Sequence, residues 1–312
     1  MDHQTSSLIG TSAHIADVRT RIARLARRRS TVSVVGGSGT GKSLVAAELH
    51  RHSGREGKFV RISAAQLDEE VFYSVLAGHV RGAFTGAHRD HEGLIEQAKG
   101  GTVFFDDVQD THAKLQAFLL DVLERQPMRA VGAPREFKLD ARIIVGLQQP
   151  ASELVKTGRL RPDLAYRLDV VRIQLLPLCD HVEDVDVLVP HLLERIDAAE
   201  GLPVPVVAPA AMRALRRYGW PGNVREVEAV LTEAMVAGRD VSDGCIELRD
   251  LRPEVRTAGG VRSAAAGISP EEIREVLDGT GGNVAAAARQ LDVHPRTMWR
   301  WMKAAGLVPR ER

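Results

Sequence analysis

The stretch TVSVVGGSGTGKS, from Thr31 to Ser43, decides the fold class of this chain. It begins with a short apolar run and continues into a glycine-rich segment that fits the pattern G-x-x-x-x-G-K-[ST]. The segment KSLVAAELHRHS, which has the apolar spacing of a helix, follows at once. Glycines here let backbone N–H groups turn toward phosphate oxygens, and the start of a helix adds partial positive charge. The stretch therefore predicts a strand, a phosphate-binding loop and a helix, with an ordinary glycine-rich turn as the alternative. The candidate loop residues are Gly36, Gly37, Ser38, Gly39, Thr40, Gly41, Lys42 and Ser43.

A second polar signal follows another apolar run. The stretch GGTVFFDD ends in Asp106 and Asp107, and carboxylates at the carboxyl edge of a parallel strand lie over the nucleotide crevice. We expect Lys42 to reach the β- and γ-phosphates of ATP, and Ser43 with Asp106 to hold Mg²⁺. Asp107 is the candidate for orienting the attacking water. Two aspartates alone more often start a loop or cap a helix, but the upstream phosphate loop favours the catalytic interpretation.

The chain around these motifs divides into an α/β part and a helical part. Apolar runs at 58–63, 101–107, 141–147 and 170–176 alternate with helical patterns, which predicts a parallel sheet with helices on both faces. From Pro177 onward the patterns are helical. We therefore expect an α/β part, a helical part, a linker without periodicity and a compact helical C-terminal domain, at 8–175, 176–250, 251–268 and 269–312 respectively; the family resemblance given below implies that the first two are an ATPase subdomain and its helical lid.

Composition sets the broad class. The chain has 312 residues and a net charge of +1, so no overall charge points to nucleic acid or membrane. Its two cysteines match no metal spacing and suit a reducing compartment. No signal-peptide pattern and no membrane-length apolar run is present, so we expect a cytoplasmic protein. The basic run at 19–29 predicts a helix with a solvated basic face, with a nucleic-acid arm as the alternative.

The stretch VRGAFTGAHRD, at 80–90, raises a separate question. It places Phe84 and Thr85 between Gly82 and Gly86 in an otherwise charged segment. An aromatic ring framed by glycines can fill the core at a turn, or it can form an exposed tip that contacts a partner. The glycines permit the backbone angles of a tight protruding loop.

Five motifs taken together resemble a known family. GGSGTGKS, GAFTGA, GGTVFFDD, RPDLAYRLDVV and WPGNVREVE occur in this order, and they resemble the AAA+ domain of bacterial enhancer-binding proteins, the ATPases that activate sigma-54 RNA polymerase. The resemblance covers roughly Leu8 to Asp250. It implies a hexameric ring that hydrolyses ATP to remodel the closed complex of sigma-54 RNA polymerase holoenzyme. It also implies that Gly82, Ala83, Phe84, Thr85, Gly86 and Ala87 form the loop that contacts sigma-54.

The resemblance assigns roles to three arginines. Arg161 and Arg167 match the arginine fingers, which reach the nucleotide of a neighbouring subunit. We expect Pro162 to occupy the first helical position, which would leave Arg161 in the preceding loop. Arg225 matches the second sensor, which reports nucleotide to the lid. Asn223 and the residue three positions later also form a candidate capping pair.

Three departures from the family pattern bear on hydrolysis. Asp107 stands where members usually carry Glu, and Ser63 and Gln148 stand where they usually carry Asn. Two hypotheses follow: a self-sufficient activator, or a catalytically weakened subunit that works in a mixed ring with an intact homologue. An unrelated AAA+ helicase or chaperone would lack the GAFTGA motif.

The C-terminal segment predicts three short helices. Asn283 is a candidate cap of the second helix and Pro295 a candidate start of the third. The spacing resembles the Fis-like helix-turn-helix domain that ends many enhancer-binding proteins, which implies binding to enhancer DNA. From Arg289 to Arg312 there are six Lys/Arg and two Asp/Glu, which suits phosphate contacts. A helical bundle for oligomer contacts is the alternative. Arg296, Thr297, Arg300 and Lys303 are the candidate DNA contacts, and Met298, Met302 and Ala305 are expected to pack inward.

Only seven residues precede Leu8, so we expect no receiver or sensor domain ahead of the ATPase. Control would then act in trans, through abundance or through a regulatory partner protein.

Overall fold

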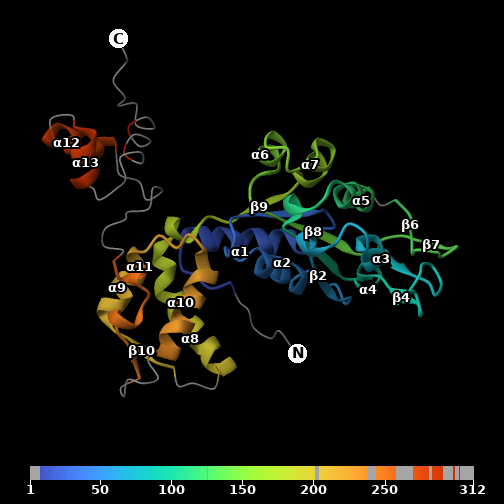
Figure 1. The fold of residues 1–312 in the computed structure, drawn as a ribbon, viewed down its shortest axis with the longest axis horizontal. Helices are drawn as coiled ribbons and strands as arrows, with labels where there is room; N and C mark the ends of the chain where they lie inside the picture. The colour runs from blue at the N-terminus through green and yellow to red at the C-terminus, as the bar shows by residue number, and fades with distance from the viewer. Residues whose placement is uncertain are drawn as a thin grey trace, which may run out of the picture. The chain divides into compact units, whose positions relative to one another are not determined.

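The computed structural model describes residues 8–124, 126–200, 204–237, 244–257, 270–280 and 283–290, together with Met298 and Met302. The chain forms two compact units (Figure 1). One unit contains Leu8 and residues 13–176, and the other contains residues 9–12 and the chain from Pro177 onward. Among the described residues, no helix is both long and apolar enough to cross a bilayer.

The first unit is built on a five-stranded sheet in the order β2-β5-β8-β1-β9, and every neighbouring pair is parallel. Each strand is short and rich in β-branched or aromatic residues, as expected for a sheet covered on both faces. This confirms the predicted parallel sheet and all five predicted strands. The strands are β1 (Val32–Val35), β2 (Phe59–Ser63), β5 (Thr102–Asp106), β8 (Arg142–Leu147) and β9 (Arg172–Gln174).

Two apolar cores lie on opposite faces of this sheet. Successive strand residues point to opposite faces, so Phe104 and Phe105, both fully buried, belong to different cores. One core includes residues of α1 (Ala13–Leu25) and α2 (Lys42–Arg51). The other includes residues of α3 (Phe72–Ala77), α4 (Leu94–Gln97), α5 (Ala113–Leu123), α6 (Ala151–Lys156) and α7 (Pro162–Leu168). Helix α1 ends at Leu25, so the predicted helix over 19–29 is too long and the last basic residues of that run follow the helix.

Two small antiparallel hairpins extend the first unit. Strands β3 (Gly78–His79) and β4 (His91–Glu92) frame the segment 80–90, and β6 (Met128–Arg129) pairs with β7 (Glu136–Phe137). A bridge between His79 and Val131 joins the two hairpins. Residues 80–90 therefore project from a fixed base.

The second unit has a helical core around Trp220, which is 1% exposed. Its main helices are α8 (Val185–Glu200), α9 (Pro209–Arg217) and α10 (Asn223–Ala237). A two-stranded parallel ladder, β10 (Val206–Val207) with β11 (Cys245–Ile246), was not predicted. The expected linker at 251–268 begins with helix α11 (Pro253–Arg256), and Val255 is fully buried in the helical core. The described start of that segment is therefore part of the helical unit.

The C-terminal segment contains α12 (Pro270–Gly279) and α13 (Val284–Gln290). Asn283 Oδ1 accepts from the backbone N–H of Ala286 at 3.0 Å, which confirms the predicted cap. Met298 and Met302 are buried in one cluster with residues of both helices, as predicted. Pro295, Arg296, Thr297, Arg300, Lys303 and Ala305 lie outside the described residues.

Candidate functional site

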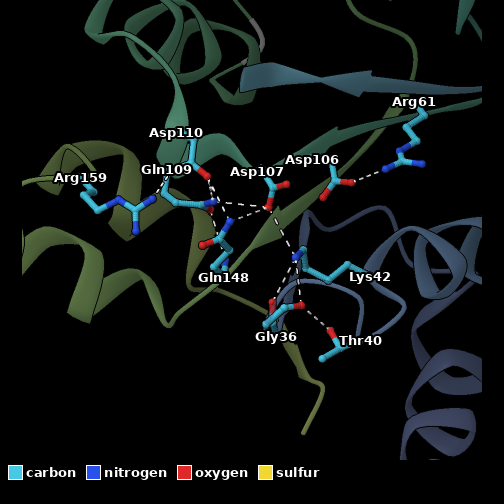
Figure 2. Close-up of polar contacts among 11 residues, drawn as sticks. Gly36, Thr40, Lys42, Arg61, Asp106, Asp107, Gln109, Asp110, Gln148 and Arg159 are labelled. Atoms are coloured by element: carbon cyan, nitrogen blue, oxygen red, sulfur yellow. Dashed lines mark hydrogen bonds and ion pairs between the residues drawn. The ribbon is translucent and has the colours of Figure 1, made fainter. Parts of the chain in front are cut away.

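The phosphate loop follows β1, and its last two residues, Lys42 and Ser43, begin α2 (Figure 2). Gly39 and Gly41 have φ angles of 76° and 95°, in the left-handed region that glycine adopts without steric cost. Lys42 is 7% exposed, and its Nζ donates to the carbonyl oxygens of Gly36 and Gly37 at 3.1 and 3.4 Å. The ammonium group is thus directed into the loop, where phosphate oxygens would be stronger partners than carbonyls.

Asp106 is the last residue of β5 and is buried. Its Oδ2 accepts from Arg61 Nη2 at 2.7 Å, whereas its buried Oδ1 has no hydrogen-bond partner within the described residues. A Cβ atom at Gly146 would lie 2.6 Å from this Oδ1, so β8 needs glycine beside the carboxylate. An unpartnered carboxylate oxygen fits a hard cation such as Mg²⁺, which prefers oxygen ligands. Asp106 and the Ser43 hydroxyl are the groups that would hold it.

Asp107 faces the phosphate loop. Its φ of 53° is left-handed, which turns the chain sharply after β5. Its Oδ1 lies 3.5 Å from Lys42 Nζ, and it accepts from Gln109 Nε2 at 3.4 Å and Gln148 Nε2 at 3.5 Å. Asp107 does precede a short 3₁₀ helix, Val108–Asp110, but its side chain makes no capping hydrogen bond there. Its side chain is directed at Lys42 instead of the following backbone.

The residues that depart from the family pattern meet at the same edge of the sheet. Ser63 ends β2 and pairs in register with Asp106. Gln148 follows β8 and bonds to Asp107. The structure thus brings together all three positions, Ser63, Asp107 and Gln148, that the sequence singled out for their effect on hydrolysis.

A polar group beside Asp107 was not predicted. Asp110 Oδ2 accepts from the Nε2 atoms of Gln109 at 2.7 Å and Gln148 at 3.2 Å, and its Oδ1 forms an ion pair with Arg159 (Figure 2). Gln109 and Asp110 closely follow the predicted pair Asp106 and Asp107, so their position in the sequence could have indicated that they belong to the site. Arg159 is 49 positions from Asp110, and no local pattern connects the two.

Arg161 and Arg167 lie at the surface of α7. Pro162 is the first residue of α7 and Arg161 is its N-cap, which confirms the expected position of the proline. Arg161 pairs with Asp163 at 2.7 Å and Arg167 with Glu124 at 2.9 Å. The hydrogen bond from Arg161 holds the pKa of Asp163 at about 2, so this pair is ionised at neutral pH. Within the described residues, neither arginine bonds to the group around Lys42 and Asp107.

Arg225 lies on α10 in the second unit. It lines an open groove of about 710 Å³ along that helix. The neighbouring turn is fixed by Glu226, whose Oε2 accepts from the Gly222 backbone N–H at 2.7 Å. Asn223 Oδ1 accepts from the Leu178 backbone N–H at 2.8 Å. These bonds therefore differ from the predicted Asn223–Glu226 capping pair: Glu226 binds the backbone one residue before Asn223, and Asn223 ties α10 to Leu178 at the start of the helical unit.

The loop Gly82–Ala87 is an exposed turn with an aromatic tip. Gly82 and Gly86 have φ angles of 81° and 102°, and a Cβ atom at either would meet nothing within 4 Å. The backbone conformation, not crowding, therefore requires these glycines. Phe84 is 47% exposed, and its ring meets His79 edge-on at a centroid distance of 4.9 Å. The core-filling alternative for Phe84 is wrong, because the ring lies on the surface.

Backbone bonds hold the base of this loop. Gly82 N–H donates to the Ala87 carbonyl at 2.9 Å, and Val80 N–H donates to the Val131 carbonyl at 3.0 Å. Arg81 N–H donates to Asp90 Oδ1 at 2.7 Å. The tip therefore lies on a turn whose base is held by backbone hydrogen bonds.

Comparison with protein families agrees with this geometry. Residues 8–174 match the sigma-54 interaction domain, residues 180–267 match an AAA+ ATPase lid domain, and residues 268–304 match the bacterial regulatory proteins of the Fis family. The chain belongs to the family of sigma-54-dependent transcriptional activators, with a Fis-type helix-turn-helix domain.

Individual relatives and structures support the same assignment. The chain is 36% identical to the transcriptional regulatory protein ZraR of Salmonella typhimurium, over 93% of this chain and 67% of that protein. It is 42% identical to the DNA-binding transcriptional regulator NtrC of Azospirillum brasilense, over 79% of this chain and 52% of that protein. The crystal structure of NtrX from Brucella abortus in complex with ATP superposes with a TM-score of 0.73 at 29% identity, covering 97% of this chain and 70% of that one. The chain thus spans about half to two thirds of the curated relatives described here.

Proposed function

We propose that the chain is a ring-forming ATPase that binds enhancer DNA and uses ATP hydrolysis to remodel the closed complex of sigma-54 RNA polymerase. The observation that carries the proposal is the meeting of Lys42 Nζ and Asp107 Oδ1, 3.5 Å apart, at a phosphate loop. The same unit presents the exposed tip of Phe84. A nucleotide site and an exposed apolar tip in one unit are what an ATP-driven contact with a protein partner requires.

Each site residue has a distinct task in the proposed reaction. Lys42 binds the β- and γ-phosphates once they replace its carbonyl partners, and Ser43 with Asp106 would hold Mg²⁺. When bound, the metal neutralises charge that develops on the phosphate oxygens. Asp107 accepts a hydrogen bond from the attacking water and aligns it with the γ-phosphate. Catalysis of this kind depends on positioning and electrostatics.

Arg161 and Arg167 would act on the nucleotide of a neighbouring subunit. Each is paired with a carboxylate of its own unit, Asp163 or Glu124, and each is exposed at the surface. An exposed pair of this kind contributes little to stability, so a phosphate can compete for the guanidinium. Arg225 would report nucleotide from the lid. Arg296, Thr297, Arg300 and Lys303 would contact DNA through the helix-turn-helix domain.

A specific observation favours the alternative of a weakened subunit. The Asp107 carboxylate is one methylene shorter than Glu, and two amide groups lie within 3.5 Å of it. Both features oppose the alignment of a water with the γ-phosphate. In this alternative the chain binds nucleotide, turns over slowly, and activates only in a mixed ring with an intact homologue.

The experiment that separates these functions is phosphate release by the purified chain as a function of its own concentration. Turnover that rises cooperatively on assembly supports the self-sufficient activator. Nucleotide binding without turnover at any concentration supports the weakened subunit. An absence of nucleotide binding would contradict both.

A further inference from the structure

The polar group beside Asp107 continues to the loop that carries Arg161. Gln109 and Gln148 each have one amide nitrogen within reach of two carboxylates, Asp107 and Asp110. Their bonds to Asp110 are the shorter ones, at 2.7 and 3.2 Å, against 3.4 and 3.5 Å to Asp107. An amide NH₂ has two protons and can serve both carboxylates at once. A change in the position of Asp107 therefore alters the amide bonds that Asp110 receives.

Asp110 connects this group to the next segment through Arg159. The two side chains form an ion pair and are 30% and 41% exposed. Partly exposed ion pairs contribute little to stability, so the main effect of this pair is to fix geometry. Two cations and two carboxylates are thereby connected from the phosphate loop outward. Lys42 pairs with Asp107, Gln148 bonds to both Asp107 and Asp110, and Asp110 pairs with Arg159.

A buried glutamine on α5 holds the backbone on either side of Leu160. Gln116 is 5% exposed, and its Nε2 donates to the Arg159 carbonyl at 3.0 Å while its Oε1 accepts from the Arg161 N–H at 3.0 Å. Leu160 between them is 2% exposed. Because both backbone bonds come from one amide group, the positions of Arg159 and Arg161 are not independent.

We propose that Asp110 and Arg159 are positioning residues that link Asp107 at the nucleotide to the arginine-bearing segment 159–161 of the same subunit. The proposal rests on the proposed ATPase function. One subunit would thereby coordinate its own nucleotide carboxylate with the arginine it offers to a neighbour. Gln109 and Gln148 connect Asp107 to Asp110, and Gln116 connects the backbone of Arg159 to that of Arg161.

Subunit mixing tests the link. In the proposed ring, Asp107→Ala and Arg161→Ala chains complement each other, because one supplies the arginine and the other the carboxylate. Arg159→Gln, which affects both ends, should lower turnover roughly 10- to 100-fold, as a misplacement of about 1 Å does. It should be rescued by neither the Asp107→Ala chain nor the Arg161→Ala chain. Rescue by one of them alone would overturn the link and leave Arg159 serving a single end. Failure of the Asp107→Ala and Arg161→Ala control mixture would instead contradict the trans arrangement of the proposed function.

Hydrogen exchange in full-length Asp110→Asn separates the link from misfolding. A non-hydrolysable ATP analogue should change amide exchange at 159–161 in the wild type. The same analogue should leave that segment unchanged in Asp110→Asn, although it binds with an affinity within about threefold of wild type. Lys156→Gln, which breaks the nearby exposed pair with Glu153 at 2.9 Å, is the matched control and should respond as wild type does. If the analogue changes amide exchange at 159–161 in Asp110→Asn as much as it does in the wild type, the proposal is overturned.

Discussion

Asp107 is the residue on which the proposed hydrolysis depends most directly. Its φ of 53° lies in a region that residues other than glycine rarely adopt, and such conformations cluster at functional sites. The left-handed turn brings its carboxylate to Lys42 on the phosphate loop. The side chain is nevertheless one C–C bond shorter than the Glu expected from the family resemblance. Whether that turn compensates for the missing length decides the rate of hydrolysis.

Asp107→Glu should raise turnover about 10- to 100-fold at saturating ATP, because a carboxylate about 1 Å too far back can cost on the order of a hundredfold. Phosphate release measures this directly. Two results would contradict the expectation. Wild-type turnover of roughly 1–10 per second would mean that Asp107 already reaches the water. A further loss in Asp107→Glu would mean that Gln109 and Gln148 have shaped the site around the shorter side chain.

Lys42→Ala should weaken ATP binding by about 10- to 100-fold, since a charge-assisted hydrogen bond to phosphate is lost. Promoter activation should disappear with it. Lys58→Ala, which removes an exposed lysine ahead of β2, is the control and should bind ATP normally. Calorimetric titration with nucleotide distinguishes the two variants. Retained activation in Lys42→Ala would refute the ATPase function.

At the scale of elements, the sequence predicted those with a local pattern and missed the contacts between residues that are far apart in the chain. All five strands of the main sheet and the helix after the phosphate loop follow from apolar runs and glycine positions. The ladders β3–β4, β6–β7 and β10–β11 have strands of two residues, in which no alternation can be recognised. The ion pair of Asp110 with Arg159 and the bonds of Gln116 to segment 159–161 join α5 and its preceding turn to a loop over 40 residues away. Such contacts depend on tertiary packing and have no local signature.

Gly82→Ala tests the proposed sigma-contact loop, Gly82–Ala87, as an element. A residue with a side chain at its φ of 81° is strained by roughly 1–2 kcal/mol, although the added methyl group meets no atom. Gly54→Ala, at a φ of 73° and equally open, is the matched control. Thermal unfolding should shift similarly in both variants. Only Gly82→Ala and Phe84→Ala should lose sigma-54 in a pull-down with an ATP transition-state analogue. Normal capture by both would return the loop to a purely structural role.

Asp184 provides an element-scale test by pH. Burial acts to raise the pKa of Asp184, but hydrogen bonds from Ser12, Thr11 and His181 outweigh it and hold the pKa below the usual 3.8. A depressed carboxyl pKa stabilises the folded state above about pH 3.8, and this contribution disappears as pH falls through the lower native value. Asp184→Asn should cost roughly 1–3 kcal/mol at neutral pH. Its acid-induced loss of stability should also be shallower than that of wild type, whereas exposed Asp17→Asn should change neither. Equal acid profiles for Asp184→Asn and wild type would contradict the prediction.

At the scale of the whole molecule, the proposed phosphate site and the proposed DNA-binding segment belong to different units. Lys42, Asp107 and the loop Gly82–Ala87 lie in the first unit, and the C-terminal segment belongs to the second. The C-terminal segment carries a local balance of six basic to two acidic residues over 289–312. Its sequence-predicted DNA contacts lie outside the described residues.

Arg296→Ala and Arg300→Ala should weaken DNA binding and leave turnover unchanged. Each lysine or arginine that neutralises a phosphate adds about 0.9 to the slope of log affinity against log salt, so each variant should lower that slope by about one. Arg274→Ala on α12 removes an exposed arginine of the same segment and is the control. Footprinting at several salt concentrations, beside phosphate release, measures both properties on one preparation. A weaker footprint with an unchanged slope would mean that the arginines contact bases rather than phosphates. Unchanged footprints with altered turnover would mean that these helices serve assembly of the ring. Contacts between subunits affect hydrolysis at the subunit interface but leave the salt dependence of DNA binding unchanged.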